Sequence, residues 1–485
     1  MNRCVLALDQ GSHASRACLF DAAGTVLASA VVTVATQHPG AAQVEQDADE
    51  LVLSLRIAAQ QAVASARATH PQLEVTAAGL AVQRSTIVCC TRARGQALAP
   101  AISWQDHRNA AWLATLAHQA ARIRDLTGLP LSAHYGASKI RWCLEHLPAV
   151  ARAAAAGELL AVPLASFLAM RLNGDSAAAT GAAFVDAANA ARTLLFDSQR
   201  LDWSDELLGL FAIKRAWLPQ SAPTRGAWGM LRIPGCEAEL RALTGDQSAV
   251  PYAEGAPDVA TVYVNLGTGG FIQRPLAARP AAPAPLLGSI LSRDSGTAIY
   301  SLEGTVNGAG AAVSWFCAQE GCDERSLWAA LDTLPASAEL PVFVNGIGGM
   351  GSPWWRATMD SHFIDDTHAG GDRLARFAAV IESVAFMIAA NAELLAQQAG
   401  APQRVLLAGG MSRSPWLCRR LAALLGLPVL VSEAEASARG VARLAAPELA
   451  SRWAEAPAQS WLPEPDPALR ARYRRFIDSV AAAGN

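Results

Sequence analysis

Lysine is nearly absent from this sequence of 485 residues: only Lys139 and Lys214 occur, and arginine carries the remaining positive charge. A Walker-type phosphate loop ends a glycine-rich turn with lysine and then serine or threonine, and neither lysine follows such a turn. A protein-kinase fold requires a strand lysine and an HRD segment, and both are missing. Any nucleotide phosphate must therefore be held by backbone amides and small polar side chains.

Strong net charge, paired cysteines and long apolar runs are also absent. The net charge is −3, so no basic field attracts nucleic acid or an anionic membrane, and we expect neither as a partner. The nine cysteines include no CxxC pair, which favours free thiols in a reducing cytosol. No long uncharged run predicts a membrane span, and the N-terminus lacks the apolar core of a signal peptide. We therefore expect a cytoplasmic protein.

Apolar residues, in contrast, make up 52% of the chain, and its length suits two domains of roughly 200–250 residues each. Alternating strand and helix patterns in both halves predict an α/β fold. A strand–turn–strand unit at 5–20 recurs at 262–272, about 255 residues later, which predicts two related halves. The crossover between them is expected near residue 253, within Pro251–Asp258, a stretch with two prolines and a glycine.

Three glycine-rich turns follow apolar strands and offer backbone amides to an anion. They read Asp9-Gln10-Gly11-Ser12, Gly267-Thr268-Gly269-Gly270 and Gly409-Gly410-Met411-Ser412. Glycine lets N–H groups approach a phosphate closely, and hydroxyls add donors. Each turn alone is also explained as a plain tight turn, whereas three of them on a duplicated α/β frame favour nucleotide binding.

Two aspartates stand beside these turns. Asp9 ends the first strand, where a carboxylate can hold Mg²⁺ through water or simply cap the turn. Asp246, in Gly245-Asp246-Gln247, precedes the expected crossover. A carboxylate beside an interdomain cleft suits a base that accepts a hydroxyl proton during phosphoryl transfer, although Gly-Asp is also a common turn.

Polar and aromatic side chains gather near other strand ends and loops of the first half. They include Gln83-Arg84, Trp104-Gln105-Asp106 and Tyr135. Such groups suit a small hydroxylated ligand, although each one alone is also explained as a surface or packing residue.

A series of segments then runs in one order over nearly the whole chain: Leu6–Gly11, Gln83-Arg84, Ala101–Asp106, Gly128–Leu131, Ser138-Lys139, Arg192–Asp197, Gly245–Gln247, Gly267–Gly269, Leu302–Gly304, Gly310–Ala312 and Gly409–Ser412. This combination resembles the FGGY carbohydrate kinases, most closely their glycerol kinase branch. The resemblance implies two actin-like (ribonuclease H-like) α/β domains with an interdomain active-site cleft. Residues 1–253 would form the substrate side and residues 254–485 the ATP side. The resemblance also implies ATP and Mg²⁺ as cofactors, a small polyol or sugar as substrate, and a homodimer or homotetramer.

The resemblance assigns roles by position. Asp246 is implied as the catalytic base, and Asp9 with Asp246 as the carboxylates at Mg²⁺. The implied substrate-binding residues are Gln83, Arg84, Ser85, Trp104, Tyr135, Asp246, Gln247 and Phe271. The implied nucleotide-binding residues are Gly11, Ser12, His13, Gly267, Thr268, Gly269, Gly310, Gly409, Gly410 and Ser414.

Four positions depart from the family pattern: Ser85, His13, Arg356 and Ser414. Ser85 stands where glycerol kinases have glutamate, and losing that acceptor could cost about 1.5–3 kcal/mol of binding. His13 follows Ser12 where a second small hydroxyl is usual, and Arg356 stands at a usually acidic position. Ser85 leaves room for a pentulose, so a xylulose or ribulose kinase is an alternative. His13 and Arg356 motivate a second alternative, a non-catalytic sugar or nucleotide sensor.

Overall fold

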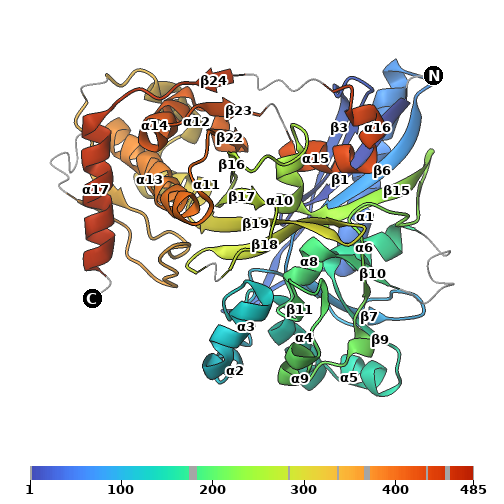
Figure 1. Ribbon diagram of the computed structural model, residues 1–485. Helices are drawn as coiled ribbons and strands as arrows, with labels where there is room; N and C mark the ends of the chain where they lie inside the picture. Colours follow the sequence, from blue (N-terminus) through green and yellow to red (C-terminus); the bar gives the residue numbers. More distant parts are fainter. Residues whose placement is uncertain are drawn as a thin grey trace.

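The computed structural model describes residues 3–173, 183–281, 284–335, 338–364, 372–432, 435–453 and 459–483. The chain forms a mixed α/β structure in which the two halves make two lobes side by side (Figure 1). Each lobe is built on a large central sheet.

The first lobe contains a six-stranded sheet in the order β14-β15-β6-β1-β2-β3. The strand bounds are β1 Arg3–Gln10, β2 Ala14–Phe20, β3 Val26–Thr33, β6 Glu74–Val82, β14 Met230–Ile233 and β15 Cys236–Gly245. Strands β1, β2 and β3 run antiparallel as a meander, whereas β1, β6 and β15 run parallel. Helix α1, Ala48–Thr69, begins at the side-chain cap of Asp47 and buries an apolar face rich in leucine and alanine.

The second lobe contains a seven-stranded sheet in the order β18-β19-β17-β16-β22-β23-β24. The strand bounds are β16 Thr261–Leu266, β17 Gly270–Leu276, β18 Leu287–Asp294, β19 Thr297–Val306, β22 Arg404–Ala408, β23 Val429–Val431 and β24 Gln459–Trp461. Strands β16 and β17 form a hairpin, and β16, β22 and β23 run parallel. The hairpin-plus-parallel arrangement of the first lobe is thus repeated, as the strand–turn–strand repeat predicts.

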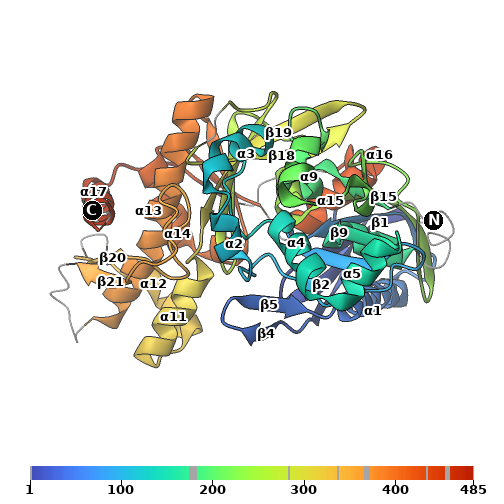
Figure 2. The same cartoon turned by 90° about the horizontal axis from the view of Figure 1, so that it is seen from below.

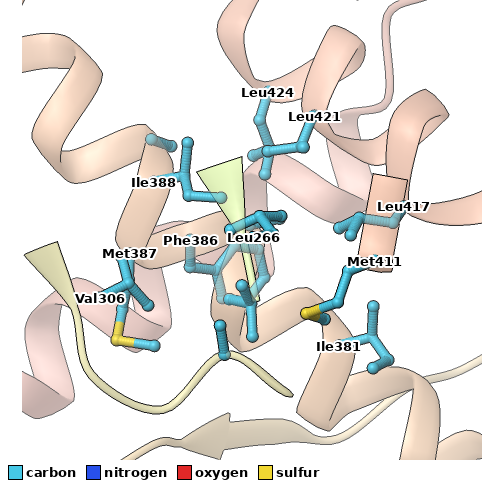
Figure 3. Packing of buried hydrophobic residues seen from close by; sticks show 14 of the residues in the cluster. Leu266, Val306, Ile381, Phe386, Met387, Ile388, Met411, Leu417, Leu421 and Leu424 are labelled. Carbon is cyan, nitrogen blue, oxygen red and sulfur yellow. The ribbon is translucent and has the colours of Figure 1, made fainter. Parts of the chain in front are cut away.

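The core of the second lobe lies directly beneath the glycine-rich turns. Figure 3 shows Leu266 at the end of β16 and Met411 of η4, Gly410–Arg413, packed among residues of two helices. These helices are α13, Arg373–Ala399, and α14, Pro415–Leu425. The residues on either side of each turn are therefore fixed by buried contacts, which gives the turns a rigid base.

Helix α13 is the only described helix that is long and apolar enough to cross a membrane. However, 89% of its most apolar window is buried inside the protein. The helix is accordingly the central helix of this core, and its apolar character is explained by packing.

Smaller elements complete the first lobe. A five-stranded sheet has the order β4-β5-β8-β7-β9, with bounds β4 Gln37–Gly40, β5 Gln43–Gln46, β8 Ala101–Ile102, β7 Ile87–Thr91 and β9 Leu159–Pro163. Figure 2 shows α4, Gly136–His146, and α5, Pro148–Ala155, beside β9 in this part of the molecule.

One late segment crosses from the second lobe to the first. Helices α15, Ala436–Ala445, and α16, Pro447–Ala450, lie beside β1 and β6 (Figure 1). Val441, Ala442 and Ala445 of α15 share a buried cluster with Val5, Ala7 and Ala77 of the first sheet. Part of the C-terminal half thus packs in the first lobe, and the two lobes interlock. The domain boundary at residues 253/254 stays a prediction.

Candidate active site

Asp9 and Asp246 lie at the same edge of the first sheet. Strand β6 runs between β1 and β15, and its Val82 is in register with Gln10 on one side and Gly245 on the other. Asp9 is at the end of β1, and Asp246 begins helix α10, Asp246–Ala249, directly after β15. The carboxyl edge of parallel strands is where α/β folds bind ligands.

Asp246 is a largely buried carboxylate whose nearest cation is at the limit of an ion pair. The side chain is 24% exposed, and its Oδ1 lies 4.0 Å from Arg84 Nε. The backbone N–H of Gln247 donates to the same oxygen at 2.7 Å. Burial raises the pKa of Asp246 to about 6; Arg84 opposes this rise and the Asp9 carboxylate adds to it. A carboxylate with this pKa is ionised at neutral pH and basic enough to accept a proton.

Asp9 is tied to the segment that returns from the second lobe. Ser437, in α15, donates its hydroxyl to Asp9 Oδ2 at 2.5 Å. Burial raises the pKa of Asp9 despite this hydrogen bond and the nearby Arg16. Arg16 in turn pairs with Glu435, just before α15. The surroundings of the Asp9 carboxylate therefore come from both the N-terminal and the C-terminal part of the chain.

Arg84 is held by a buried carboxylate of the second lobe. Its Nη1 and Nη2 donate to Glu303 Oε1 and Oε2 at 2.9 and 3.0 Å. Arg192 pairs with the same carboxylate. Although burial opposes ionisation, Arg192 and Arg84 hold the pKa of Glu303 well below its usual range. Two arginines of the first lobe thus meet one glutamate of β19.

Ser12 belongs to a hydrogen-bond chain that joins the first turn to the substrate segments. Trp104 Nε1 donates to Ser12 Oγ at 2.8 Å, and Ser12 Oγ donates to Gln83 Oε1 at 2.9 Å. Gln83 Nε2 donates to Gln46 Oε1 at 2.8 Å, and Gln46 Nε2 donates to the Ser12 carbonyl at 2.8 Å. The ring of bonds fixes Trp104 and Gln83 relative to the turn.

Gln247 connects the neighbourhood of Asp246 to the second lobe. Its side-chain oxygen accepts from Asn265 Nδ2 at 3.1 Å, and its carbonyl accepts from Gln273 Nε2 at 2.7 Å. Asn265 is two residues before Gly267, so Asp246 lies across the lobe boundary from the second glycine-rich turn.

That turn is bonded to the start of helix α11, Gly310–Glu320. The amide of Gly310 donates to the Gly267 carbonyl, and the amide of Ala311 donates to the Thr268 carbonyl, each at 2.9 Å. A Cβ at Gly310 would lie 2.7 Å from the Gly267 oxygen, so only glycine fits this approach. Gly267 and Thr268 are exposed, and Gly269 is half-buried.

The third turn follows β22. Gly409 has φ +92°, and a Cβ there would overlap the Leu266 carbonyl at the end of β16, so the turn lies against the second one. Gly410 is exposed, whereas Ser414 caps α14, its hydroxyl accepting from the Leu417 amide at 3.3 Å. The structure therefore brings Gly267–Gly269, Gly310 and Gly409-Gly410 together at one edge of the second sheet.

The remaining candidates differ in how they are placed. His13 is exposed next to Gly11 and Ser12, and Phe271 is half-buried on β17. Tyr135 is buried within a core cluster, where burial raises the pKa of its hydroxyl. Arg356 donates to the Val480 carbonyl at 2.8 Å, in the C-terminal helix α17, Pro467–Ala482.

Sequence reasoning gave no role to four residues that organise the site: His134, Lys139, Arg192 and Glu303. Lys139 is buried and donates to the carbonyls of Ser85 at 3.0 Å and His134 at 2.6 Å. The His134 ring lies 5.5 Å from Trp104 between ring centroids. Lys139 could have been singled out from the sequence, because it is one of only two lysines and lies in a segment that matches the family.

A magnesium ion would depend on oxygen ligands beyond the protein. The described residues contain no group of three or more His, Cys, Asp or Glu side chains placed to hold a metal. Asp9 and Asp246 supply the carboxylate oxygens that Mg²⁺ prefers, and Mg²⁺ commonly completes its shell with water and substrate phosphates. The donor set thus fits Mg²⁺ bound together with a nucleotide.

Two interlocked α/β lobes, with the carboxylates of Asp9 and Asp246 on one and glycine-rich turns on the other, define a small-molecule kinase architecture. The comparisons agree. Residues 4–264 match the N-terminal domain model of the FGGY family of carbohydrate kinases, and residues 262–448 match its C-terminal domain model. The chain belongs to the FGGY family and is an ATP-dependent kinase that phosphorylates an alcohol group of a small polyol or sugar.

Individual relatives cover most of the chain. A glycerol kinase of Xanthobacter autotrophicus is 35% identical over 464 residues, which is 91% of this chain and 89% of that protein. The crystal structure of Plasmodium falciparum glycerol kinase with ADP superposes with a TM-score of 0.87 at 19% identity, covering 100% and 98% of the two chains. A ligand-bound xylulose kinase from Lactobacillus acidophilus gives a TM-score of 0.83 at 18% identity, covering 99% and 98%.

Proposed function

We propose that the kinase transfers the γ-phosphoryl group of ATP directly to a substrate hydroxyl, with Asp246 as the base. Asp246 accepts the hydroxyl proton, and the substrate oxygen attacks the γ-phosphorus in line as the bond to the β–γ bridging oxygen breaks and ADP leaves. The observation that carries this proposal is the position of Asp246. It is a partly buried carboxylate at the carboxyl edge of the first sheet, and burial raises its pKa to about 6. Its neighbour Gln247 accepts a hydrogen bond from Asn265, two residues before the Gly267–Gly269 turn.

The other candidate residues bind and orient the nucleotide and the substrate. Amides of Gly11, Ser12, His13 and Gly267–Gly269 stabilise charge on the transferring phosphoryl group, while Gly310, Gly409, Gly410 and Ser414 contact the nucleotide. Gln83, Arg84, Ser85, Trp104, Tyr135, Gln247 and Phe271 line the substrate side. Asp9 and Asp246 would hold Mg²⁺, which would neutralise part of the phosphate charge.

A catalytic function is favoured over the alternative of a non-catalytic sensor. Asp9 and Asp246 are both retained, and Arg356, one of the two residues that motivated the sensor alternative, bonds the Val480 carbonyl of α17. Among acceptors, the proposal covers glycerol-like and longer polyols and pentuloses, because Ser85 replaces a larger acidic side chain.

The direct test is Asp246→Asn. ADP release, measured with MgATP and a panel of glycerol, polyols and pentuloses, should fall about 10²–10⁴-fold in the variant, because the amide cannot accept the proton. ADP binding, measured by calorimetry, should persist. Asp294→Asn, in the exposed pair with Arg225, is the control and should keep full activity. Full turnover by Asp246→Asn would contradict the assignment of the base.

A further inference from the structure

The guanidinium group of Arg84 faces two carboxylates at unequal distances. Its terminal nitrogens Nη1 and Nη2 donate to Glu303 Oε1 and Oε2 at 2.9 and 3.0 Å. Its Nε lies 4.0 Å from Asp246 Oδ1, which is beyond the distance of an N–H···O hydrogen bond. Arg84 is therefore bonded to Glu303 by two parallel hydrogen bonds, whereas Asp246 only attracts it through space.

The Glu303 carboxylate is buried and fixed from several sides. Its side chain is 2% exposed. Besides the two bonds from Arg84, its Oε2 accepts from Arg192 Nη2, and its Oε1 accepts from Ser301 Oγ at 3.3 Å. Although burial opposes ionisation, Arg192 and Arg84 hold the pKa of Glu303 well below its usual range, so the group is ionised. A fixed, ionised carboxylate holds the planar fork of an arginine in one orientation.

The stem of Arg84 is confined by the backbone that carries Asp246. A Cβ at Gly245 would lie 2.6 Å from both Cγ and Cδ of Arg84, so the stem lies directly against this glycine. Gly245 immediately precedes Asp246. The stem is therefore held beside the segment that carries the carboxylate, and the bonds to Glu303 determine where the guanidinium end points.

Asp246 is the next carboxylate that acts on Arg84 after Glu303. Burial opposes the charge of Arg84, but Glu303 first and Asp246 second favour it, and the net effect raises the pKa of Arg84. A buried guanidinium that loses its carboxylate partner is strongly disfavoured, so a turn toward Asp246 becomes favourable once Glu303 is neutral. A direct pair would place arginine N–H groups on the Asp246 oxygens, where a substrate hydroxyl would otherwise donate.

We infer that Glu303 is a positioning residue for the phosphoryl transfer: by binding Arg84 it holds the guanidinium off Asp246 and keeps the Asp246 oxygens open to the substrate hydroxyl. This inference rests on the proposed function, in which Asp246 is the base. Glu303 acts through Arg84 and not by contact with the reacting atoms. Because Glu303 belongs to β19 of the second sheet and Arg84 follows β6 of the first, contact between the lobes keeps the base accessible.

Glu303→Gln tests the inference, and Glu382→Gln is its matched control. Both glutamates are buried, and each accepts two hydrogen bonds from one arginine and pairs with a second; for Glu382 these are Arg472 and Arg420. The acceptor is the member of the panel that the parent enzyme phosphorylates fastest. We expect kcat to fall about 10- to 100-fold in Glu303→Gln, because the base is obstructed, and to stay parental in Glu382→Gln. Equal kcat in the two variants would overturn the inference.

A double variant keeps the test decisive if Glu303→Gln does not fold. Glu303→Gln combined with Arg192→Gln removes one charge of each sign, so one buried guanidinium is left without its carboxylate instead of two. The double variant should therefore be the more stable one. Arg84 is still released from Glu303, so kcat should again fall about 10- to 100-fold. Parental kcat in this double variant would contradict the role of Glu303.

A double-mutant cycle shows whether Glu303 acts through Arg84. In Arg84→Gln no guanidinium at position 84 can turn onto Asp246. Adding Glu303→Gln to that variant should therefore change kcat by less than about twofold, against 10- to 100-fold in the parent. Effects of the two substitutions that multiply in full would overturn the inference, because they would show that Glu303 contributes independently of Arg84.

A crystal structure of Glu303→Gln, or of the double variant, separates this inference from the proposed function. We expect an Arg84 nitrogen within about 3 Å of an Asp246 oxygen, and this observation needs no turnover. If Arg84 makes this move while Asp246→Asn keeps full activity, the hold of Glu303 on Arg84 is supported and only the assignment of the base fails. Arg84 at its parental distance from Asp246 would reject the inference itself.

Discussion

Asp246 combines a buried position with one cation at 4.0 Å and one carboxylate nearby. Burial and Asp9 favour the neutral acid, and Arg84 favours the anion. The balance places the pKa at about 6, well above the usual value for aspartate. The residue is therefore a stronger base than an exposed aspartate and is still ionised at neutral pH.

A pH dependence follows from this balance. Only the ionised form accepts a proton, so kcat/KM for the alcohol at saturating MgATP should rise about tenfold per pH unit below pH 6 and level off above it. The measurement is the rate profile from pH 4.5 to 8. Because phosphate also titrates near pH 6, ADP affinity over the same range is the control. A flat profile between pH 5 and 7 would contradict the environment described for Asp246.

Residues next to strand ends could be predicted from the sequence, and their partners could not. Asp9 stands out because it ends an apolar strand, and Asp246 stands out because it precedes the expected crossover. Glu303 lies 219 residues from Arg84, and nothing local in the sequence pairs them. The prediction that Ser12 binds nucleotide does not reveal that its hydroxyl also bonds Trp104 and Gln83. Long-range partners of this kind are set by tertiary packing, which local patterns do not encode.

At the scale of elements, the long periodic segments were predicted well. The strand–turn–strand unit expected at 262–272 corresponds to β16, Thr261–Leu266, and the start of β17, and the helical pattern expected in the second half includes α13, Arg373–Ala399. The five-stranded sheet was missed, because its strands have only two to five residues and show no clear alternation. The return of α15 to the first sheet was also missed, since periodicity identifies a buried face but not its partner.

Strand β19 and the end of β6 are joined by the Arg84–Glu303–Arg192 cluster, and Glu303→Gln tests its contribution. The substitution leaves two buried guanidinium groups without their carboxylate, so the free energy of unfolding should fall by about 3–5 kcal/mol. Urea unfolding of the purified protein measures this. Glu206→Gln, in the exposed pair with Arg122, is the matched control and should change stability little.

Unchanged stability of the Glu303→Gln variant would show what holds β19 against the first lobe. If Glu303→Gln unfolds at the same urea concentration as the parent, the contact between β19 and the first lobe is held by apolar packing alone. Leu287 and Ile290 of β18 share a buried cluster with Leu129 and Val185 of the first lobe, so such packing exists.

At the scale of the molecule, the lobes are interlocked where α15 meets the segment that carries Asp246. Gly440 of α15 is buried, and a Cβ there would overlap the Ala249 carbonyl at the end of α10. Helix α10 begins with Asp246, so the close approach of α15 helps to fix the position of the Asp246 carboxylate. Ser437, one turn earlier in α15, bonds Asp9. One helix of the C-terminal half therefore positions both carboxylates of the site.

Gly440→Ala should accordingly lower activity and stability together. The added methyl forces α15 and α10 apart, and overpacking of this kind costs about 1–3 kcal/mol. Displacement of Asp246 by a fraction of an ångström to about 1 Å should lower kcat by up to about 100-fold. Gly209→Ala, in helix α9, Asp205–Phe211, where a Cβ meets nothing within 4 Å, is the control. It should stabilise the protein by up to about 1 kcal/mol and leave kcat unchanged, because alanine favours the helix. A Gly440→Ala enzyme with parental kcat and stability would show that α15 does not position the base.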